Sequence, residues 1–192
     1  GLNEECMRSV FFSIVFGLWL GVFMPRAQAE VLVVDPILRG EVSRALAGQQ
    51  ALDKKEGFKV FKAEGATALK AIILDEGEWP ANRGRAIEAL AHDFPTPETF
   101  AFLKGLLDSR SETAAFLKRR MLDALGANFK SEAAPVFEKA LADTDILVRE
   151  SALLGLAAVL GSKAKPLLVV QQEHEKEPYL QRLLAKLLKK IG

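Results

Sequence analysis

The sequence predicts an all-α protein built from stacked helix pairs, an α-solenoid. Apolar residues recur at helical spacing along most of the chain, and the breaks between these stretches recur at similar intervals. Gly126 and Gly161 lie 35 residues apart, and Pro135 and Pro166 lie 31 residues apart. Because one helix pair cannot bury both of its faces, repeated pairs stabilise one another by stacking. A helical bundle without internal repeats is the alternative arrangement of the same helices.

Length and composition are those of a single folded domain. The chain has 192 residues, of which 49% are hydrophobic and 27% are charged. These fractions are ordinary for a globular protein and exclude extensive disorder. The formal net charge of +1 gives no electrostatic reason to expect nucleic acid or an anionic membrane as a partner.

The N-terminal residues have the pattern of a secretory signal peptide. A basic start at Arg8 precedes the almost wholly apolar residues 10–24, and Ala27 and Ala29 form a small-x-small cleavage pattern. The apolar run is 15 residues long, shorter than the ~20 that span a bilayer, which favours cleavage over an uncleaved membrane anchor. We therefore predict a signal-peptide helix in residues 1–29, cleavage after Ala29, and an exported domain, periplasmic or secreted, of residues 30–192 without a stable membrane span.

Cysteine chemistry is not expected in the exported domain. The only cysteine of the chain is Cys6, which lies before the apolar run. Cleavage after Ala29 would remove it, so disulfides, thiol catalysis and cysteine-ligated zinc are excluded.

One stretch, residues 143–161, has the clearest repeat pattern. Asp145 can cap its start and Gly161 can end it. Its apolar residues fall four apart on one helix face: Val148, Ala152, Leu156 and Leu160. The stretch resembles the second helix of a HEAT repeat, whose pattern is Asp, a few residues, Val-Arg-x-x-Ala-x-x-x-Leu and a closing Leu-Gly. The resemblance implies a right-handed, armadillo-type α-solenoid whose second helices line a concave face, and a scaffold that binds other proteins.

The breaks divide the domain into four to five HEAT-like helix pairs. In the first, Asp35 is the expected N-cap and Pro36 the first helical residue. Ser131 and Ser162 are expected to cap the first helices of the last two pairs. The fixed small and aromatic positions of tetratricopeptide repeats are absent. The predicted pairs cover residues 36–64, 66–94, 97–126, 131–161 and 162–192.

A ladder of Asp–Arg contacts along the turns is expected to be interrupted. Arg83 and Ala86 match Arg149 and Ala152 at a shift of 66 residues. At a shift of 35 residues, however, Ala114 stands where Arg149 stands in the next pair. The alanine side chain cannot donate a hydrogen bond to an aspartate, so we expect no Asp–Arg contact at that position.

No motif for catalysis or for metal binding is present. His92 and His174 are the only histidines, and neither has a second histidine three or four residues away. We interpret both as solvated turn residues. Without a phosphate loop or a nucleophile elbow, we expect no catalytic residue, no metal and no cofactor. The alternative is an accessory subunit of an enzyme, since HEAT-like repeats also occur in bilin lyases.

The resemblance places a set of basic residues on the concave face. Arg83, Arg119 and Arg149 would form a stripe there, with Lys118 beside it. Some HEAT-like proteins, including alkylpurine DNA glycosylases, bind DNA through such a surface. The alternative is a solvated face balanced by neighbouring acidic residues, namely Glu88, Asp123 and Glu150. We favour the alternative, because nucleic-acid binders are usually far more basic.

Trp79 is the only tryptophan after the leader and precedes a helix start at Pro80. An exposed tryptophan would be a binding anchor, whereas a packed one would cover the adjacent helix pair, and we favour the packed position. The sequence thus predicts a monomeric, non-enzymatic scaffold for an unidentified protein partner. Its candidate binding residues are Trp79, Arg83, Lys118, Arg119 and Arg149.

Overall fold

The all-α prediction is confirmed. A computed structural model of the chain describes residues 32–52, 55–109 and 114–191, and these residues form helices and no strand. The predicted signal peptide, residues 1–29, lies outside the described residues.

The helices follow one another at short intervals. The α-helices are α1 (Pro36–Leu46), α2 (Lys62–Leu74), α3 (Pro80–Asp93), α4 (Pro97–Ser109), α5 (Ala115–Phe129), α6 (Ala134–Ala140), α7 (Ile146–Leu160), α8 (Lys165–His174) and α9 (Pro178–Ile191). Three short 3-10 helices precede α2, α6 and α8: η2 (Gly57–Phe61), η3 (Lys130–Ala133) and η4 (Gly161–Ala164).

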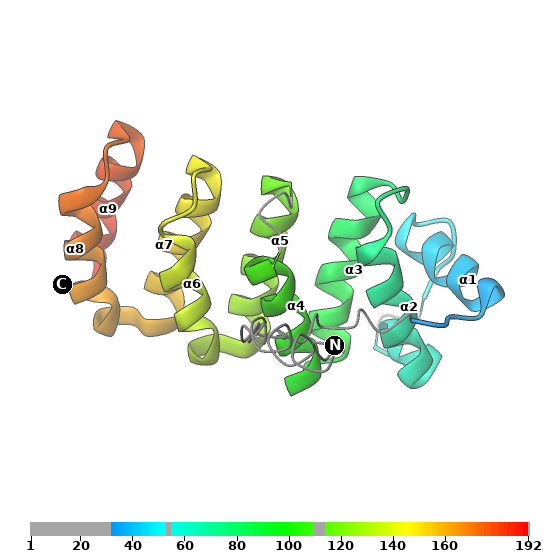
Figure 1. The fold of residues 1–192 in the computed structure, drawn as a ribbon. Coiled ribbons are helices and arrows are strands. Elements are labelled where there is room, and N and C mark those ends of the chain that lie inside the picture. The colour runs from blue at the N-terminus through cyan, green and yellow to red at the C-terminus, as the bar shows by residue number, and fades with distance from the viewer. Residues whose placement is uncertain (1–31, 53–54, 110–113, 192) are drawn as a thin grey trace, which may run out of the picture. The chain divides into compact units, whose positions relative to one another are not determined.

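Every other α-helix packs against its counterpart in the next pair. Helices α1, α3, α5, α7 and α9 form a row in which each contacts the next, and we call them the second helices. The first helices α2, α4, α6 and α8 each contact the second helix that follows them. Figure 1 shows the pairs from α2 to α9 side by side in chain order.

The core lies where the second helices meet the first helices. Leucine occupies the eleventh position of α1, α3, α5 and α7, and all four side chains are buried: Leu46, Leu90, Leu125 and Leu156. The seventh position, one turn earlier on the same face, is also buried in each of these helices. Each buried leucine contributes roughly 1.5–3 kcal/mol relative to an exposed one, so this row of side chains stabilises the contact between pairs.

The predicted first pair, residues 36–64, is wrong. Helix α1 has the position of a second helix, and residues 57–61 form a 3-10 helix that leads into α2. Lys62, at φ 53°, separates η2 from the rest of α2, since this conformation interrupts a continuous helix. Before α1, Val34 packs against the core. The described residues therefore hold no first helix for α1.

The predicted end of the 97–126 pair is also wrong. Helix α5 continues through Gly126 to Phe129. A Cβ atom on Gly126 would lie 2.9 Å from Cζ of Phe137. The glycine is thus in the helix interior because an aromatic ring packs against it, and it does not end the helix.

Two predicted caps are confirmed and two are wrong. Asp35 Oδ1 accepts from the Ile37 N–H at 2.8 Å, and Asp145 caps α7 in the same way. Ser131 and Ser162 lie within η3 and η4, and neither caps a helix. Helices α6 and α8 begin just after these 3-10 turns with proline in the first turn, where the missing N–H needs no partner.

Among the described residues, the segment Ile146–His174 is long and apolar enough to cross a membrane by length and composition alone. It comprises α7, η4 and α8, with Gly161 at φ 56° between them. Val148, Ala152 and Leu153 of α7 are buried in the core. Other apolar side chains of α7, such as Leu147 and Leu154, are exposed.

Candidate functional site

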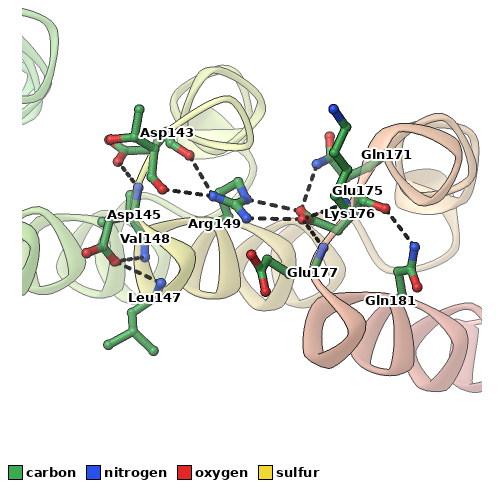
Figure 2. Close-up of polar contacts among 11 residues, drawn as sticks. Asp143, Asp145, Leu147, Val148, Arg149, Gln171, Glu175, Lys176, Glu177 and Gln181 are labelled. Atoms are coloured by element: carbon green, nitrogen blue, oxygen red, sulfur yellow. Dashed lines mark hydrogen bonds and ion pairs between the residues drawn. The ribbon is translucent and has the colours of Figure 1, made fainter.

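A polar contact that is largely shielded from solvent joins α7 to the turn before α9 (Figure 2). Arg149, the fourth residue of α7, donates from Nε and Nη2 to the two carboxylate oxygens of Glu175, at 3.0 Å each. Its Nη1 donates to the carbonyls of Asp143 and Thr144 at 3.0 and 3.1 Å. The Arg149 side chain is 15% exposed and that of Glu175 is 3% exposed. The ion pair is thus shielded from solvent and bidentate, the strong geometry for such pairs.

An equivalent contact is made from two other second helices, α5 and α1. Lys118, the fourth residue of α5, donates to Asp143 Oδ2 at 2.8 Å. Arg39, the fourth residue of α1, pairs with Asp75. In each case the cation of one pair reaches the turn that precedes the next second helix. We call these three contacts the joints.

Each acidic residue of a joint also holds its own turn. Asp75 Oδ1 accepts from the Gly77 N–H at 2.8 Å, and Asp143 Oδ1 accepts from the Asp145 N–H at 2.9 Å. Glu175 Oε1 accepts from the N–H groups of Lys176 and Glu177 at 3.1 Å. One carboxylate therefore organises a turn and binds the preceding pair at the same time.

The joints shift the ionisation of their acidic groups. At Asp143 and Glu175, burial acts to raise the pKa, but hydrogen bonds from Lys118 and Arg149 and from the turn N–H groups outweigh it, so both pKa values are lowered. The pKa of Asp75 is lowered by the Gly77 N–H and by Arg39. All three carboxylates are therefore favoured in the charged form.

The expected interruption of the ladder is wrong. Ala114 lies before α5 as its N-cap residue, and the residue that corresponds to Arg149 is Lys118. The matching shift is 31 residues rather than 35. Lys118 takes the place of the arginine and makes the same contact with Asp143.

The predicted basic stripe is not a free surface. Arg149 and Lys118 are bound in joints, and Arg83, the fourth residue of α3, donates from Nε to the Ile73 carbonyl at 2.9 Å. Arg119 is half-buried and donates from Nε to Ser151 Oγ at 3.4 Å. The structure therefore does not bring these side chains together as a cationic surface.

Trp79 does not take the packed position that the sequence favours. Its side chain is 75% exposed at the N-cap of α3. The two histidines are exposed as expected: His92 Nδ1 lies 2.8 Å from Asp93 Oδ1, and His174 Nδ1 lies 2.8 Å from the Val170 carbonyl. In the described part of the chain, no group of three or more side chains could hold a metal ion.

Two hollows with mostly apolar walls flank α5, and Arg85, Glu88 and Asp93 also line the larger one. The larger, about 680 Å³, lies between α3 and α5 and is closed at one end by α1 and η2. The smaller, about 570 Å³, lies between α5 and α7. Asp123 and Ala127 of α5 line both hollows. These two residues, one turn apart on α5, therefore lie between the hollows.

Small side chains form much of the wall of these hollows. Ala89 and Ala124 line the larger one, and Gly155 and Ala158 line the smaller one. A Cβ on Gly155 would lie 2.2 Å from Cε1 of Phe137, so glycine is required for the ring to pack there. The aromatic ring and the absent side chains together give the smaller hollow an apolar wall.

One carboxylate is placed between the two hollows. Burial raises the pKa of Asp123, although the nearby charges of Arg119 and Arg120 act in the opposite direction. Arg120 itself pairs with Glu88 at 2.5 Å. Asp123 can thus accept a hydrogen bond from a ligand whose apolar groups enter the hollows.

No protein family model matches the chain, and no curated protein or solved structure is significantly similar to it. The residues of the hollows were not predicted as a site. The available signal was weak, since it consists of alanine and glycine at exposed positions of second helices, such as Ala127 and Ala158.

Proposed function

We propose that the chain is an exported HEAT-like α-solenoid scaffold that binds a protein partner and catalyses no reaction itself. The row of contacting second helices and the three joints support the solenoid, because each second helix contacts the next and three of these four connections carry an equivalent ion pair. The match of residues 143–161 to the HEAT pattern supports the family.

The observation that carries the binding function is the pair of hollows beside α5. They are apolar, open and adjacent, and they lie on the row of second helices, the face that HEAT-like scaffolds use for binding. A partner segment with two apolar side chains could fill both hollows at once. Because the joints bind Arg149 and Lys118 within the protein, this apolar surface is a better candidate contact than a cationic one.

A selection experiment tests this proposal. A displayed peptide library is selected on the immobilised full chain, and each enriched peptide is then measured against Ala127→Arg. Ala127 is exposed, so the arginine should be tolerated by the fold while it blocks both hollows. We expect the enriched peptides to lose at least about tenfold in affinity, or ~1.4 kcal/mol.

The matched control is Ala101→Arg, at an exposed position of the first helix α4. It adds the same charge away from the hollows and should leave binding unchanged. Failure to enrich any peptide, or equal binding to the Ala127→Arg variant, would contradict the proposal. Circular dichroism of both variants checks that the helices remain.

Export is tested separately by the N-terminus of the mature protein. The full chain is expressed with its leader, and the protein recovered outside the cytoplasm is analysed by intact mass and N-terminal sequencing. We expect a chain that starts at Glu30. Recovery of the uncut chain in the membrane fraction would instead indicate an anchor.

A further inference from the structure

A second surface lies on the same helices, at the opposite end from the hollows. Each second helix exposes one large apolar side chain at its N-terminal end, between 41% and 75% exposed. Four occupy the second helical position and the fifth, Trp79, is the N-cap of α3. We call this set the apolar row: Ile37, Trp79, Phe116, Leu147 and Tyr179.

Joints and helix contacts bring these five side chains to one edge of the protein. Joints link α1 to the turn before α3, α5 to the turn before α7 and α7 to the turn before α9, and α3 packs directly against α5, so the N-terminal ends of the second helices lie side by side. Packed helices lie roughly 8–10 Å apart. The apolar row is therefore a periodic series with about that spacing, ~35 Å from end to end.

Acidic side chains flank the apolar row on its outer side. They lie one or two residues before the first residue of four second helices: Asp35 before α1, Glu78 before α3, Asp145 before α7 and Glu177 before α9. Among the described residues, none of the four forms an ion pair with a cation. Asp35 and Asp145 also accept from helix N–H groups, but no ion pair neutralises their charge, so the four carboxylates give this side a negative potential.

Arginines flank the apolar row on its inner side. Arg85, Arg119, Arg120 and Arg182 occupy the fifth or sixth positions of α3, α5 and α9. Glu150 holds the fifth position of α7, where it accepts from the Tyr179 hydroxyl. Arg120 is paired with Glu88, and Glu41 holds the sixth position of α1, so this border carries both signs. Its cations without a carboxylate partner among the described residues are Arg85, Arg119 and Arg182.

The width between the two borders indicates the shape of the occupant. Five to six helical residues separate them, about 8 Å at 1.5 Å per residue. An α-helix with its side chains is about 10 Å wide, so it can cover the apolar row and reach both borders. Residues seven apart on such a helix are ~10.5 Å apart, close to the spacing of the second helices.

We propose that the apolar row binds an amphipathic α-helix of about 25 residues from a protein partner, laid across the N-terminal ends of the second helices. Lys and Arg flank the apolar stripe of this helix on the side that meets the acidic border, and Asp and Glu flank it on the other side. This proposal rests on the proposed function, because both require a protein partner. It adds that the bound segment is an amphipathic helix.

The probe is a designed 25-mer with a leucine stripe at heptad spacing, lysines along one flank and glutamates along the other. Its binding to the full chain is measured by fluorescence anisotropy. In the double variant Phe116→Ser and Leu147→Ser, we expect the Kd to rise by at least about tenfold. Both residues are partly exposed, so the fold should persist.

The matched control is Val169→Ser with Val170→Ser, which removes two exposed apolar side chains from the first helix α8. This variant should bind the designed 25-mer with the same Kd as the unchanged protein. A peptide with the two flanks exchanged between lysine and glutamate should bind several-fold more weakly. The Ala127→Arg variant should bind the probe normally, so failure of this proposal and failure of the hollows as a site are distinguishable.

Four outcomes would overturn the proposal: no binding of the probe to the unchanged protein, an unchanged Kd in the double variant, equal binding of the flank-exchanged peptide, or tighter binding of a proline-rich peptide. A fifth arm uses phosphatidylcholine vesicles. Vesicle binding that the double variant loses would assign the apolar row to a membrane surface instead.

Discussion

The two end joints occupy equivalent positions but differ in geometry and in burial. At the C-terminal joint, Arg149 donates two hydrogen bonds to Glu175, and the carboxylate is almost fully buried. At the N-terminal joint, Arg39 pairs with Asp75 through Nη2 alone, and its Nε is buried without a hydrogen-bond partner among the described residues. Both side chains of that pair are more than one-third exposed.

Because of this difference, we expect ion pairs at equivalent positions of the second helices to contribute unequally to the free energy of unfolding. An exposed ion pair contributes ~0–1 kcal/mol because water and salt screen it. A buried pair loses ~3–5 kcal/mol when one partner is removed, since the other charge is left uncompensated. We therefore expect the joints to differ in their effect on stability, in the order of their burial.

Low pH should reduce the free energy of unfolding most, because it protonates the carboxylates of all three joints. The folded-state pKa values of Asp75, Asp143 and Glu175 are lowered from 3.8, 3.8 and 4.5. Lowered values stabilise the protein above the unfolded pKa, and this stability is lost as the pH falls through the folded values. Urea unfolding between pH 7 and 2 should show a decline that begins near pH 4.5. A constant free energy of unfolding below pH 4 would contradict this assignment.

The second largest effect is expected from Glu175→Gln. It removes the charge that Arg149 faces while it keeps an acceptor for the turn N–H groups. We expect the free energy of unfolding to fall by ~3–5 kcal/mol, measured by urea denaturation with circular dichroism. Adding Arg149→Met should restore part of the loss, because no buried charge then remains. Additive losses would show that the ion pair itself does not cause the effect.

Asp143→Asn should have an intermediate effect. Lys118 and Asp143 have side chains that are 14% and 16% exposed, so the lysine is left partly buried without its carboxylate. The expected loss is ~1–3 kcal/mol in the same unfolding assay. A loss as large as that of Glu175→Gln would mean that burial does not order the joints.

Arg39→Gln should have the smallest effect, at most ~1 kcal/mol, since the pair is exposed and screened. The remaining effect of this joint should decrease further in 1 M salt, where charges are screened within ~3 Å. Lys139→Gln, which removes an exposed ion pair with Asp108 outside the joints, is the matched control. A loss of several kcal/mol on Arg39→Gln would show that the N-terminal joint is more than a surface pair.

Local signals predicted the elements better than the contacts between them. Asp145 caps α7 and Pro80 starts α3 as expected, because both act within one turn of helix. The joints were missed because they depend on counting from the start of each second helix. Gly126 predicts the wrong repeat length, 35 residues, because glycine is typical of a helix end. It lies inside α5 against Phe137.

The binding surfaces were harder still to predict. The hollows result from glycine and alanine on α5 and α7, whose effect depends on how closely the neighbouring helices approach. Trp79 is ambiguous in the sequence, because packed and exposed tryptophans look alike there. Only the arrangement of the second helices shows that it lies in line with Phe116 and Leu147 at one edge of the molecule.

The joints are directional, with the cation always from the N-terminal side and the carboxylate from the C-terminal side. Lys118 and Arg149 face equivalent carboxylates, Asp143 and Glu175. If the helix pair that contains Asp143 and Arg149 were lost, Lys118 would therefore face Glu175. Duplication of a pair would extend the series without a mismatch. The protein can therefore change length during evolution by whole units at these two joints and keep their charges matched.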